Sequence, residues 1–365
     1  MINKYTARGC ARQLVLTLAK PQATLANGLA GRARKRHAQG DRYMGHIIAI
    51  SNLKGGIGKT TTVVNVGAGL ALKGARVLLV DVDAQGNLAM ALGVEPRRTL
   101  YDVLVDNASP EAVIITARPN LDLLPSDHTL LGAQPVIAQR PDWSRALEKA
   151  LRPIIYQYDF ILIDSGGSLT PLNVNAFMAA KSVIAPTTIE HFSLKSIDLL
   201  FQQVARVKGS SGAIKLIVPT MFDPRVKQSA DLLNELRSRY GELVGPPVRV
   251  NVRLSEAPRY GQTIYEFDSR SRGAVDYALL VERVCELFPF EARVQEPSGQ
   301  GSGVRGQVQV NNQQPATDNR RPTTTPTTCP NCGHAINHAT LAGYDVAYCN
   351  NCRWTSQRLV REPRR

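Results

Sequence analysis

The sequence contains no apolar run that approaches the roughly 20 residues needed to span a bilayer. No continuous apolar core with a cleavage site follows the basic residues near its start, so no export signal is recognised. Cysteine is scarce: six are present, and only Cys285 lies within residues 44–290. These absences argue against a secreted disulfide framework and against an iron–sulfur reductase, whose core must supply cluster ligands. We expect a cytoplasmic protein without a stable membrane anchor.

Acidic residues are rare at both ends of the 365-residue chain. Residues 1–43 contain nine Lys or Arg against the single acid Asp41, and residues 291–365 contain nine against five. Residues 44–290 are near neutral, although the whole chain has a formal net charge of +14. Basic extensions suit binding to nucleic acid or to an anionic membrane; the alternative is solvated tails that only keep the protein soluble.

A glycine-rich loop, KGGIGKTTT, occupies Lys54–Thr62. The apolar run His46–Ile50 before it predicts a buried strand, and Thr61–Leu72 after it predicts a helix. Between a strand and a helix, such a loop binds phosphates through backbone N–H groups and the helix N-terminus. Lys59 would reach the β- and γ-phosphates of a nucleoside triphosphate, and the Thr60 hydroxyl would ligate Mg²⁺. We therefore predict a nucleotide site at this loop.

Apolar runs alternate with helical patterns from Met44 to Phe290, which predicts an α/β fold: a mostly parallel sheet with helices on both faces, as in P-loop NTPases. Ligands then bind beyond the carboxyl ends of the strands. Further strands are expected at Arg76–Val80, Phe160–Ile163, Ser182–Ala185, Ile214–Val218 and near Val248–Val250. Further helices are expected at Trp143–Leu151, Ser193–Val207, Ser229–Tyr240 and Val275–Leu287.

Composition divides the chain into four parts. Residues 1–43 form a basic N-terminal extension, which is either a flexible arm or a segment upstream of a true start at Met44. Residues 44–290 form the ATPase-like domain. Residues 291–328 are rich in Gly, Gln, Asn, Pro and Thr, which predicts a disordered linker. Residues 329–365 form a small module with a basic tail.

Four cysteines of this last module form two C-x₂-C pairs separated by sixteen residues. Four thiolates at this spacing suit a tetrahedral Zn²⁺ held by two knuckles, a structural site that is closed to chemistry. We therefore predict a zinc ribbon, with another redox or iron role as the alternative. The predicted ligands are Cys329, Cys332, Cys349 and Cys352.

The glycine-rich loop has Leu53 where the usual pattern has glycine, and it begins with a second lysine, Lys54. In this it resembles the deviant Walker A motif of the ParA/Soj/MinD family of ATPases. VLLVDVDAQGN, Val77–Asn87, is similar to the family's second motif. FILIDSGGSLTPLNVNA, Phe160–Ala176, resembles its Walker B segment, with Ser165–Gly167 in place of a typical Cys-Pro-Pro. The segments that are similar to the chromosomal ParA (Soj) branch are NVRLSEAP, Asn251–Pro258, and SRGA, Ser271–Ala274.

The resemblance implies an ATP hydrolase that uses Mg²⁺, with Lys54, Lys59, Asp83 and Asp164 in catalysis. Lys54 would reach across an ATP-dependent homodimer to the partner's phosphates, since it has no role in its own subunit's site. Asp83 would orient the attacking water, Asp81 would support the metal indirectly, and Asp164 would hold Mg²⁺ through a water. The residues expected to bind ATP are Lys54, Gly55, Gly56, Gly58, Lys59, Thr60, Thr61 and Asp81, with Thr220 and Asp223 at the base.

The resemblance also implies non-specific binding of double-stranded DNA through Lys and Arg contacts to phosphates, with nucleoid association. A ParB-type centromere-binding partner would stimulate hydrolysis, and the function would be chromosome or plasmid partition. The alternative is a MinD-like or cargo-positioning ATPase that acts at a membrane or a protein assembly. The candidate DNA contacts, each of which has an ordinary solvated charge as its alternative, are Arg225, Lys227, Arg253, Arg259, Arg270 and Arg272.

Overall fold

The computed structural model describes residues 45–168, 170–190 and 193–291, together with residues 328–329, 333, 335, 337–341, 344–348 and 355–359. The chain divides into two compact units between residues 292 and 293. The predicted N-terminal extension lies outside the described residues, as does the predicted linker apart from residues 291 and 328, so both stay predictions. No helix in the described part of the chain is long and apolar enough to cross a membrane.

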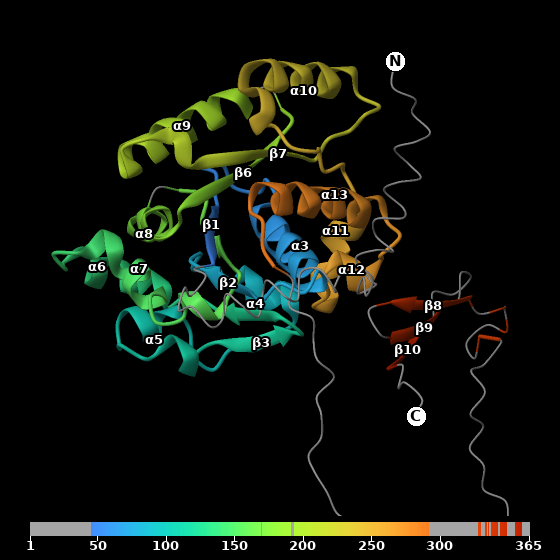
Figure 1. Ribbon diagram of the computed structural model, residues 1–365, viewed down its shortest axis with the longest axis horizontal. Coiled ribbons are helices and arrows are strands. Elements are labelled where there is room, and N and C mark those ends of the chain that lie inside the picture. Colours follow the sequence, from blue (N-terminus) through green and yellow to red (C-terminus); the bar gives the residue numbers. More distant parts are fainter. Residues whose placement is uncertain are drawn as a thin grey trace, which may run out of the picture. The chain divides into compact units, whose positions relative to one another are not determined.

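The first unit is built around a seven-stranded sheet (Figure 1). Its strand order is β3-β4-β2-β5-β1-β6-β7, and every neighbouring pair is parallel except the antiparallel pair β3 and β4. This confirms the predicted α/β fold with a mostly parallel sheet. The strands are β1 (His46–Ile50), β2 (Val77–Asp81), β3 (Ile115–Arg118), β4 (Leu121–Leu124), β5 (Phe160–Asp164), β6 (Ser182–Thr188) and β7 (Ile214–Thr220).

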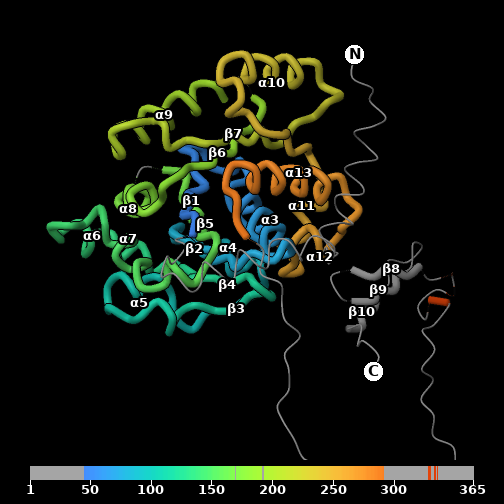
Figure 2. The backbone as a smooth tube through the Cα atoms, in the orientation of Figure 1, coloured from blue at the N-terminus to red at the C-terminus, as the bar shows by residue number. Residues whose placement is uncertain are grey.

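Helices cover both faces of this sheet, as the ribbon and the tube show (Figures 1 and 2). One face carries α3 (Lys59–Leu72), α4 (Asn87–Leu92), α12 (Ile264–Phe267) and α13 (Arg272–Leu287). The other face carries α5 (Leu100–Leu104), α6 (Leu130–Ala138), α7 (Ala146–Leu151), α8 (Pro171–Ala179), α9 (Ser193–Lys208) and α10 (Lys227–Tyr240). A short helix, α11 (Val252–Glu256), precedes α12.

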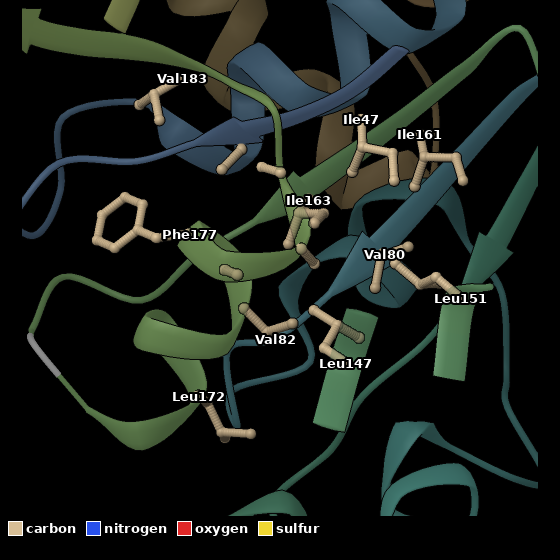
Figure 3. Packing of buried hydrophobic residues seen from close by; sticks show 14 of the residues in the cluster. Ile47, Val80, Val82, Leu147, Leu151, Ile161, Ile163, Leu172, Phe177 and Val183 are labelled. Carbon is tan, nitrogen blue, oxygen red and sulfur yellow. The ribbon is translucent and has the colours of Figure 1, made fainter. Parts of the chain in front are cut away.

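The sheet contributes apolar side chains to two separate cores, because successive residues of a strand point to opposite faces. In β1, Ile47 belongs to the core under α5–α10, whereas Ile48 belongs to the core under α3 and α13. Figure 3 shows Ile47 beside Ile161, and Val80 of β2 beside Leu151 of α7, in the first of these cores. Every residue of β2 and β5 is buried, as expected for central parallel strands that are covered on both sides.

The strand predicted near Val248–Val250 is not formed, so that prediction is wrong. The segment is joined to the end of β7 by backbone hydrogen bonds and by one isolated bridge between Phe222 and Arg249. Two prolines without N–H donors precede it, and the Arg249 N–H donates to the Asp276 carboxylate instead of to a neighbouring strand. The edge strand β3 and its neighbour β4 were not predicted, because runs of four residues show too little periodicity.

The second unit contains a three-stranded antiparallel sheet in the order β10-β9-β8. Its strands are β8 (Asn337–Leu341), β9 (Tyr344–Tyr348) and β10 (Thr355–Leu359). Before β8, Thr328 and Ala335 form an isolated antiparallel bridge. Cys332, Cys349 and Cys352 lie outside the described residues, so the zinc ribbon stays a prediction.

Candidate functional site

Three loops meet at the carboxyl edge of the first unit's sheet, because the strands that precede them are hydrogen-bonded neighbours. Asp164, at the end of β5, is in register with Ile50 of β1 on one side and with Asp81 of β2 on the other. The glycine-rich loop follows Ile50, and the segment that contains Asp83 follows Asp81. The fold therefore brings the residues predicted for phosphate, metal and water binding to one place.

The glycine-rich loop ends in an uncapped helix N-terminus. Gly56 and Gly58 have φ angles of 70° and 85°, a left-handed conformation that side chains rarely adopt. Gly58 is the N-cap of α3, where no side chain accepts from the backbone N–H groups and no acidic residue occupies the first turn. The free N–H groups and the helix dipole together favour an anion at this position.

Lys59 places a buried ammonium group beside the loop. Its side chain is 8% exposed, and Nζ donates to the carbonyl oxygen of Lys54 at 2.9 Å. Burial lowers the pKa of Lys59, whereas the nearby carboxylates of Asp164 and Asp83 raise it. A desolvated cation at this position can form strong, charge-assisted hydrogen bonds to phosphate oxygens.

Thr60 and Asp164 form the part of the site that suits a divalent cation. Thr60 Oγ1 donates to Asp164 Oδ2 at 2.6 Å, whereas Asp164 Oδ1 is buried and has no hydrogen-bond partner among the described residues. Burial raises the pKa of Asp164 well above its usual range, and the nearby Asp81 raises it further. Hydroxyl and carboxylate oxygens are ligands that Mg²⁺ prefers, and a buried unsatisfied carboxylate oxygen is costly. These residues therefore fit Mg²⁺ and its bound water.

The segment after β2 is anchored by the buried carboxylate of Asp81. Its Oδ1 accepts from the backbone N–H of Asp83 at 3.0 Å, and its Oδ2 accepts from that of Leu88 at 3.1 Å. Burial raises the pKa of Asp81 to about 7. The hydroxyl of the buried Ser126 donates to the carbonyl oxygen of Asp83 at 2.5 Å. These contacts hold the backbone of Asp83, while its side chain stays partly exposed.

The loop Ser165–Ser168 lies between the glycine-rich loop and Asp83. A Cβ added to Gly167 would lie 3.1 Å from the backbone nitrogen of Gly55, and one added to Gly166 would lie 3.6 Å from Asp83 Oδ2. This loop therefore forms one wall of the site, between the two groups that are predicted to act on phosphate and on water.

Asn173 of α8 binds this loop with its side-chain amide. Asn173 Oδ1 accepts from the Gly166 N–H at 3.2 Å, and Nδ2 donates to the carbonyl oxygens of Gly166, at 3.0 Å, and of Ser168. The sequence analysis missed both Asn173 and Ser126. Only the short spacing between the Gly166–Gly167 pair and the first turn of the next helix could have indicated Asn173.

Lys54 has partners in its own subunit, which the sequence analysis did not anticipate. Its Nζ forms an ion pair with Glu190 Oε2 at 2.5 Å and donates to Thr188 Oγ1 at 3.4 Å. The two charged side chains are 38% and 56% exposed. An ion pair this exposed contributes little stability, so it leaves Lys54 available for another anion.

The two residues predicted to contact the adenine base of ATP occupy different environments. Thr220, at the end of β7, is buried, and its hydroxyl donates to the carbonyl oxygen of Ile57 in the glycine-rich loop at 2.9 Å. Asp223 forms a two-pronged ion pair with Arg225, which lowers the pKa of Asp223 to about 2. Thr220 therefore joins the site directly, whereas the carboxylate of Asp223 is already bound to an arginine.

The candidate DNA contacts differ in how they are held. Arg225 is paired with Asp223 but keeps an 85% exposed side chain. Arg253 is half-buried, is paired with Glu256 and Asp268, and lies over the ring of Phe267, so it has a structural role. The remaining candidates are all exposed: Lys227, Arg259, Arg270 and Arg272.

In the second unit, the first predicted knuckle is partly described. Cys329 is 3% exposed, and its carbonyl oxygen accepts from the Gly333 N–H at 2.8 Å. Gly333, directly after the first C-x₂-C pair, has a φ of 72°, a left-handed conformation that favours glycine. Within the described residues, no three His, Cys, Asp or Glu side chains cluster as a metal site. Cys285, in α13 of the first unit, is half-buried, and burial raises the pKa of its thiol to about 11.

Comparison with known proteins follows the same motifs. A protein-family model described as an AAA domain matches residues 45–216. The sporulation initiation inhibitor protein Soj of Bacillus subtilis is 40% identical over 249 residues, which cover 66% of this chain and 98% of that protein. The chromosome partitioning protein ParA of Caulobacter vibrioides is 39% identical over 248 residues, 65% of this chain and 93% of that protein.

A solved structure also matches the fold. It is the cobyrinic acid a,c-diamide synthase of Mycobacterium smegmatis with a bound ATP analogue and magnesium, at a TM-score of 0.58 and 28% identity. The match covers 68% of this chain and 98% of that one. The same fold therefore holds a nucleotide and magnesium in a protein with this degree of likeness.

Proposed function

Because the chain belongs to the ParA/Soj family of P-loop ATPases, we propose that it hydrolyses ATP to drive the partition of a chromosome or plasmid. The ATP-bound form is a homodimer that binds double-stranded DNA without sequence preference and is stimulated by a ParB-type partner. The protein then acts in the cytoplasm, on the nucleoid, without a stable membrane anchor.

The observation that carries this proposal is the meeting of three loops around an unsatisfied carboxylate oxygen. The backbone N–H groups of Gly55–Thr61 and the Lys59 ammonium group bind the phosphates of ATP. The Thr60 hydroxyl and, through a water, Asp164 hold Mg²⁺, which supplies charge neutralisation at the transferred phosphoryl group. Asp83 orients the attacking water from a backbone held by Asp81 and Ser126.

The dimer is proposed from the position of Lys54. It lies at the start of the loop, on the exposed side, and its ion pair with Glu190 is solvent-screened. In the ATP-bound dimer, Lys54 leaves Glu190 and binds the phosphates in the partner's site. ATP binding and dimerisation are then a single event, which explains why two lysines occupy one loop.

DNA binding is proposed from the family and from the exposed basic side chains of the first unit. Arg253 is paired with acidic residues of its own fold, so we do not propose it as a main DNA contact. The exposed candidates are Arg225, Lys227, Arg259, Arg270 and Arg272. Contacts of this kind neutralise phosphates and release counterions, so they give affinity that falls steeply with salt.

Binding of a fluorescent duplex, with and without a non-hydrolysable ATP analogue and across a salt series, tests the proposal. We expect binding only with the analogue, no preference between unrelated sequences, and a steep loss of affinity with salt. Equal binding without nucleotide, or binding that ignores salt, would contradict it. The matched control is Lys59→Ala, which should not respond to nucleotide.

We also propose that the second unit holds one structural Zn²⁺ through Cys329, Cys332, Cys349 and Cys352. The hydrogen bond from the Gly333 N–H to the carbonyl oxygen of the buried Cys329 supports the first knuckle, because C-x₂-C pairs that bind zinc lie in short turns. Metal analysis of the full chain and of a chain that ends at residue 324 tests this. We expect one zinc per full chain, none in the shorter chain and unchanged ATP turnover; equal zinc in both would exclude the four cysteines.

A further inference from the structure

We propose that Asn173 is a positioning residue for ATP hydrolysis, because its buried amide fixes the loop Gly166–Ser168 between the glycine-rich loop and Asp83. The inference rests on the proposed role of Asp83 in orienting water. It adds a residue whose side chain is not expected to touch ATP and which acts through the loop it binds.

The amide of Asn173 is well placed to hold this loop. Asn173 is 2% exposed, and it forms three hydrogen bonds to the loop: one as acceptor from Gly166 N and two as donor to Gly166 O and Ser168 O. Its own backbone N–H donates to Thr170 Oγ1 at 3.3 Å, in the N-cap of α8. The capped first turn of α8 therefore fixes the backbone position from which the Asn173 amide reaches the loop.

The loop needs such an anchor because two glycines stand in succession. Glycine loses more backbone freedom on ordering than any other residue, so an isolated Gly166–Gly167 pair would sample many conformations. Neither glycine has a positive φ, so neither is required here for a left-handed backbone. The hydrogen bonds from Asn173 select one conformation from those that glycine permits.

The selected conformation determines where the wall of the site lies. The Cβ direction of Gly166 points to Asp83 Oδ2 at 3.6 Å, and that of Gly167 points to the nitrogen of Gly55 at 3.1 Å. A shift of the loop by about 1 Å would change the space between the phosphate-binding loop and the water-positioning carboxylate, and shifts of this size cost about 100-fold in rate. Loss of Asn173 should therefore affect the chemical step more than ATP binding.

The test compares Asn173→Ala with Asn175→Ala. Asn175 lies two residues further on α8 and is equally buried, but its amide binds Leu147, Trp143 and Pro171, not the loop. Both variants lose a buried amide and should be destabilised, so turnover is measured at temperatures at which each is folded. We expect Asn173→Ala to lower kcat by about 10- to 100-fold with KM for ATP changed less than about threefold. Asn175→Ala should keep both values.

A rescue variant separates positioning from general damage. Gly166→Ala adds a Cβ at ordinary contact distance from Asp83 and Asn173, and it restricts the loop without using the amide. In the Asn173→Ala background it should recover part of the lost kcat. Wild-type kcat in Asn173→Ala, or an equal loss in Asn175→Ala, would overturn the inference, as would a double variant no faster than Asn173→Ala.

Asp83→Ala, measured in parallel, distinguishes failure of this inference from failure of the proposed function. If Asp83→Ala turns over normally, the proposed role of Asp83 fails, and this inference fails with it. If Asp83→Ala loses turnover but Asn173→Ala does not, only the role of Asn173 is wrong.

Discussion

The two glycine loops at the edge of the sheet use glycine for different physical reasons. Gly56 and Gly58 have left-handed φ angles, and a Cβ at either would meet open space or a contact no closer than 3.9 Å. Gly167 has no positive φ, but a Cβ there would come within 3.1 Å of the backbone of Gly55. The first loop needs glycine for its backbone conformation, whereas the second needs it for close approach.

The two loops also differ in what holds them. The glycine-rich loop is held by two contacts close in sequence, from Lys59 to Lys54 and from Thr62 to Gly58. It is also held by one distant contact, from the Thr220 hydroxyl to the carbonyl oxygen of Ile57. The loop after β5 is held by an amide of the following helix, and the Asp83 segment is held by Ser126, which lies 43 residues away. The motif of the phosphate-binding loop is thus a local feature of the sequence, whereas the side chains that hold the loop after β5 and the Asp83 backbone lie outside the motifs.

Asp83→Ala gives the largest expected effect, because it removes the water-positioning group and leaves the phosphate loop intact. Turnover should fall by about 10²- to 10⁴-fold, while ATP binding and ATP-dependent dimerisation persist. Steady-state hydrolysis and nucleotide titration measure the two separately. Asp127→Ala is the matched control, since within the described part of the chain the Asp127 carboxylate accepts hydrogen bonds only from Thr129 in its own turn. Loss of ATP binding in Asp83→Ala would show that ATP binding and water positioning are not carried out by separate segments.

Lys54→Ala tests the one residue of the glycine-rich loop that is proposed to act outside its own subunit. Nucleotide binding should persist, and the ATP-dependent dimer should weaken by about 10- to 100-fold, the usual loss for a hydrogen bond to a charged group. Light scattering with a non-hydrolysable analogue measures it. Lys73→Ala, which removes the ion pair with Glu282 at the other end of α3, should dimerise normally. Normal dimerisation of Lys54→Ala would remove the proposed role in the partner's site.

The same contrast explains how much could be predicted from the sequence. The strand, glycine loop and helix of His46–Leu72 were predictable because apolar periodicity and the spacing of Lys59 and Thr60 are local features. The ends of β5 and β2, which place Asp164 and Asp81, were predictable from uninterrupted apolar runs. These patterns were sufficient to predict most of the parallel strands and the residues of the phosphate-binding loop.

The contacts of Asn173, Ser126 and Glu190 were not predictable, because each depends on how separate elements pack. Nothing in the local pattern of α8 distinguishes Asn173 from Asn175, although one binds the loop and the other binds α7 and the turn before it. The structure also shows Lys54 bound within its own subunit, whereas spacing alone suggested a lysine without a local partner.

The carboxylates beneath the two loops predict a smaller, pH-dependent effect. Burial raises the pKa of Asp81 to about 7, against about 4 in an unfolded chain. Between these values the folded state binds more protons than the unfolded state, so the free energy of unfolding should fall as pH rises from about 4 to 7. Below about pH 4 the ionisation of Asp81 does not lower the free energy of unfolding, and above about pH 7 it lowers it by its full amount. The buried neighbour Asp164 shifts in the same direction.

Urea unfolding in the presence of EDTA, at several pH values across this window, measures the effect. As pH rises through this window, the free energy of unfolding of Asp81→Asn should fall less steeply than that of the wild type. The difference should be on the order of 1 kcal/mol per pH unit, because the asparagine side chain does not ionise. Asp122→Asn, which changes a carboxylate that accepts from the Tyr158 hydroxyl away from the site, is the control. Parallel pH profiles for the wild type and Asp81→Asn would mean that Asp81 is ionised throughout.

The smallest effect distinguishes the two uses of glycine directly. Gly58→Ala forces an alanine into a left-handed backbone with φ near 85°, which should lower the free energy of unfolding by about 1 to 2 kcal/mol. Gly166→Ala keeps a backbone that alanine tolerates and has room for the Cβ, so it should be neutral or stabilise by up to about 1 kcal/mol. Denaturant unfolding should therefore show a loss of stability for Gly58→Ala and no loss for Gly166→Ala.

Gly58→Ala and Gly166→Ala should also differ in their affinity for ATP. Gly58 is the N-cap of α3, so a strained residue there displaces the N–H groups that bind phosphate, and the Kd for ATP should rise. A Cβ added at Gly166 would have Asp83 and Asn173 as its nearest neighbours and not the phosphate loop, so Gly166→Ala should leave the Kd unchanged. If both variants lose stability and affinity alike, glycine is required at 166 for its conformation. The loop after β5 is then a second phosphate-binding loop and not a wall that Asn173 fixes.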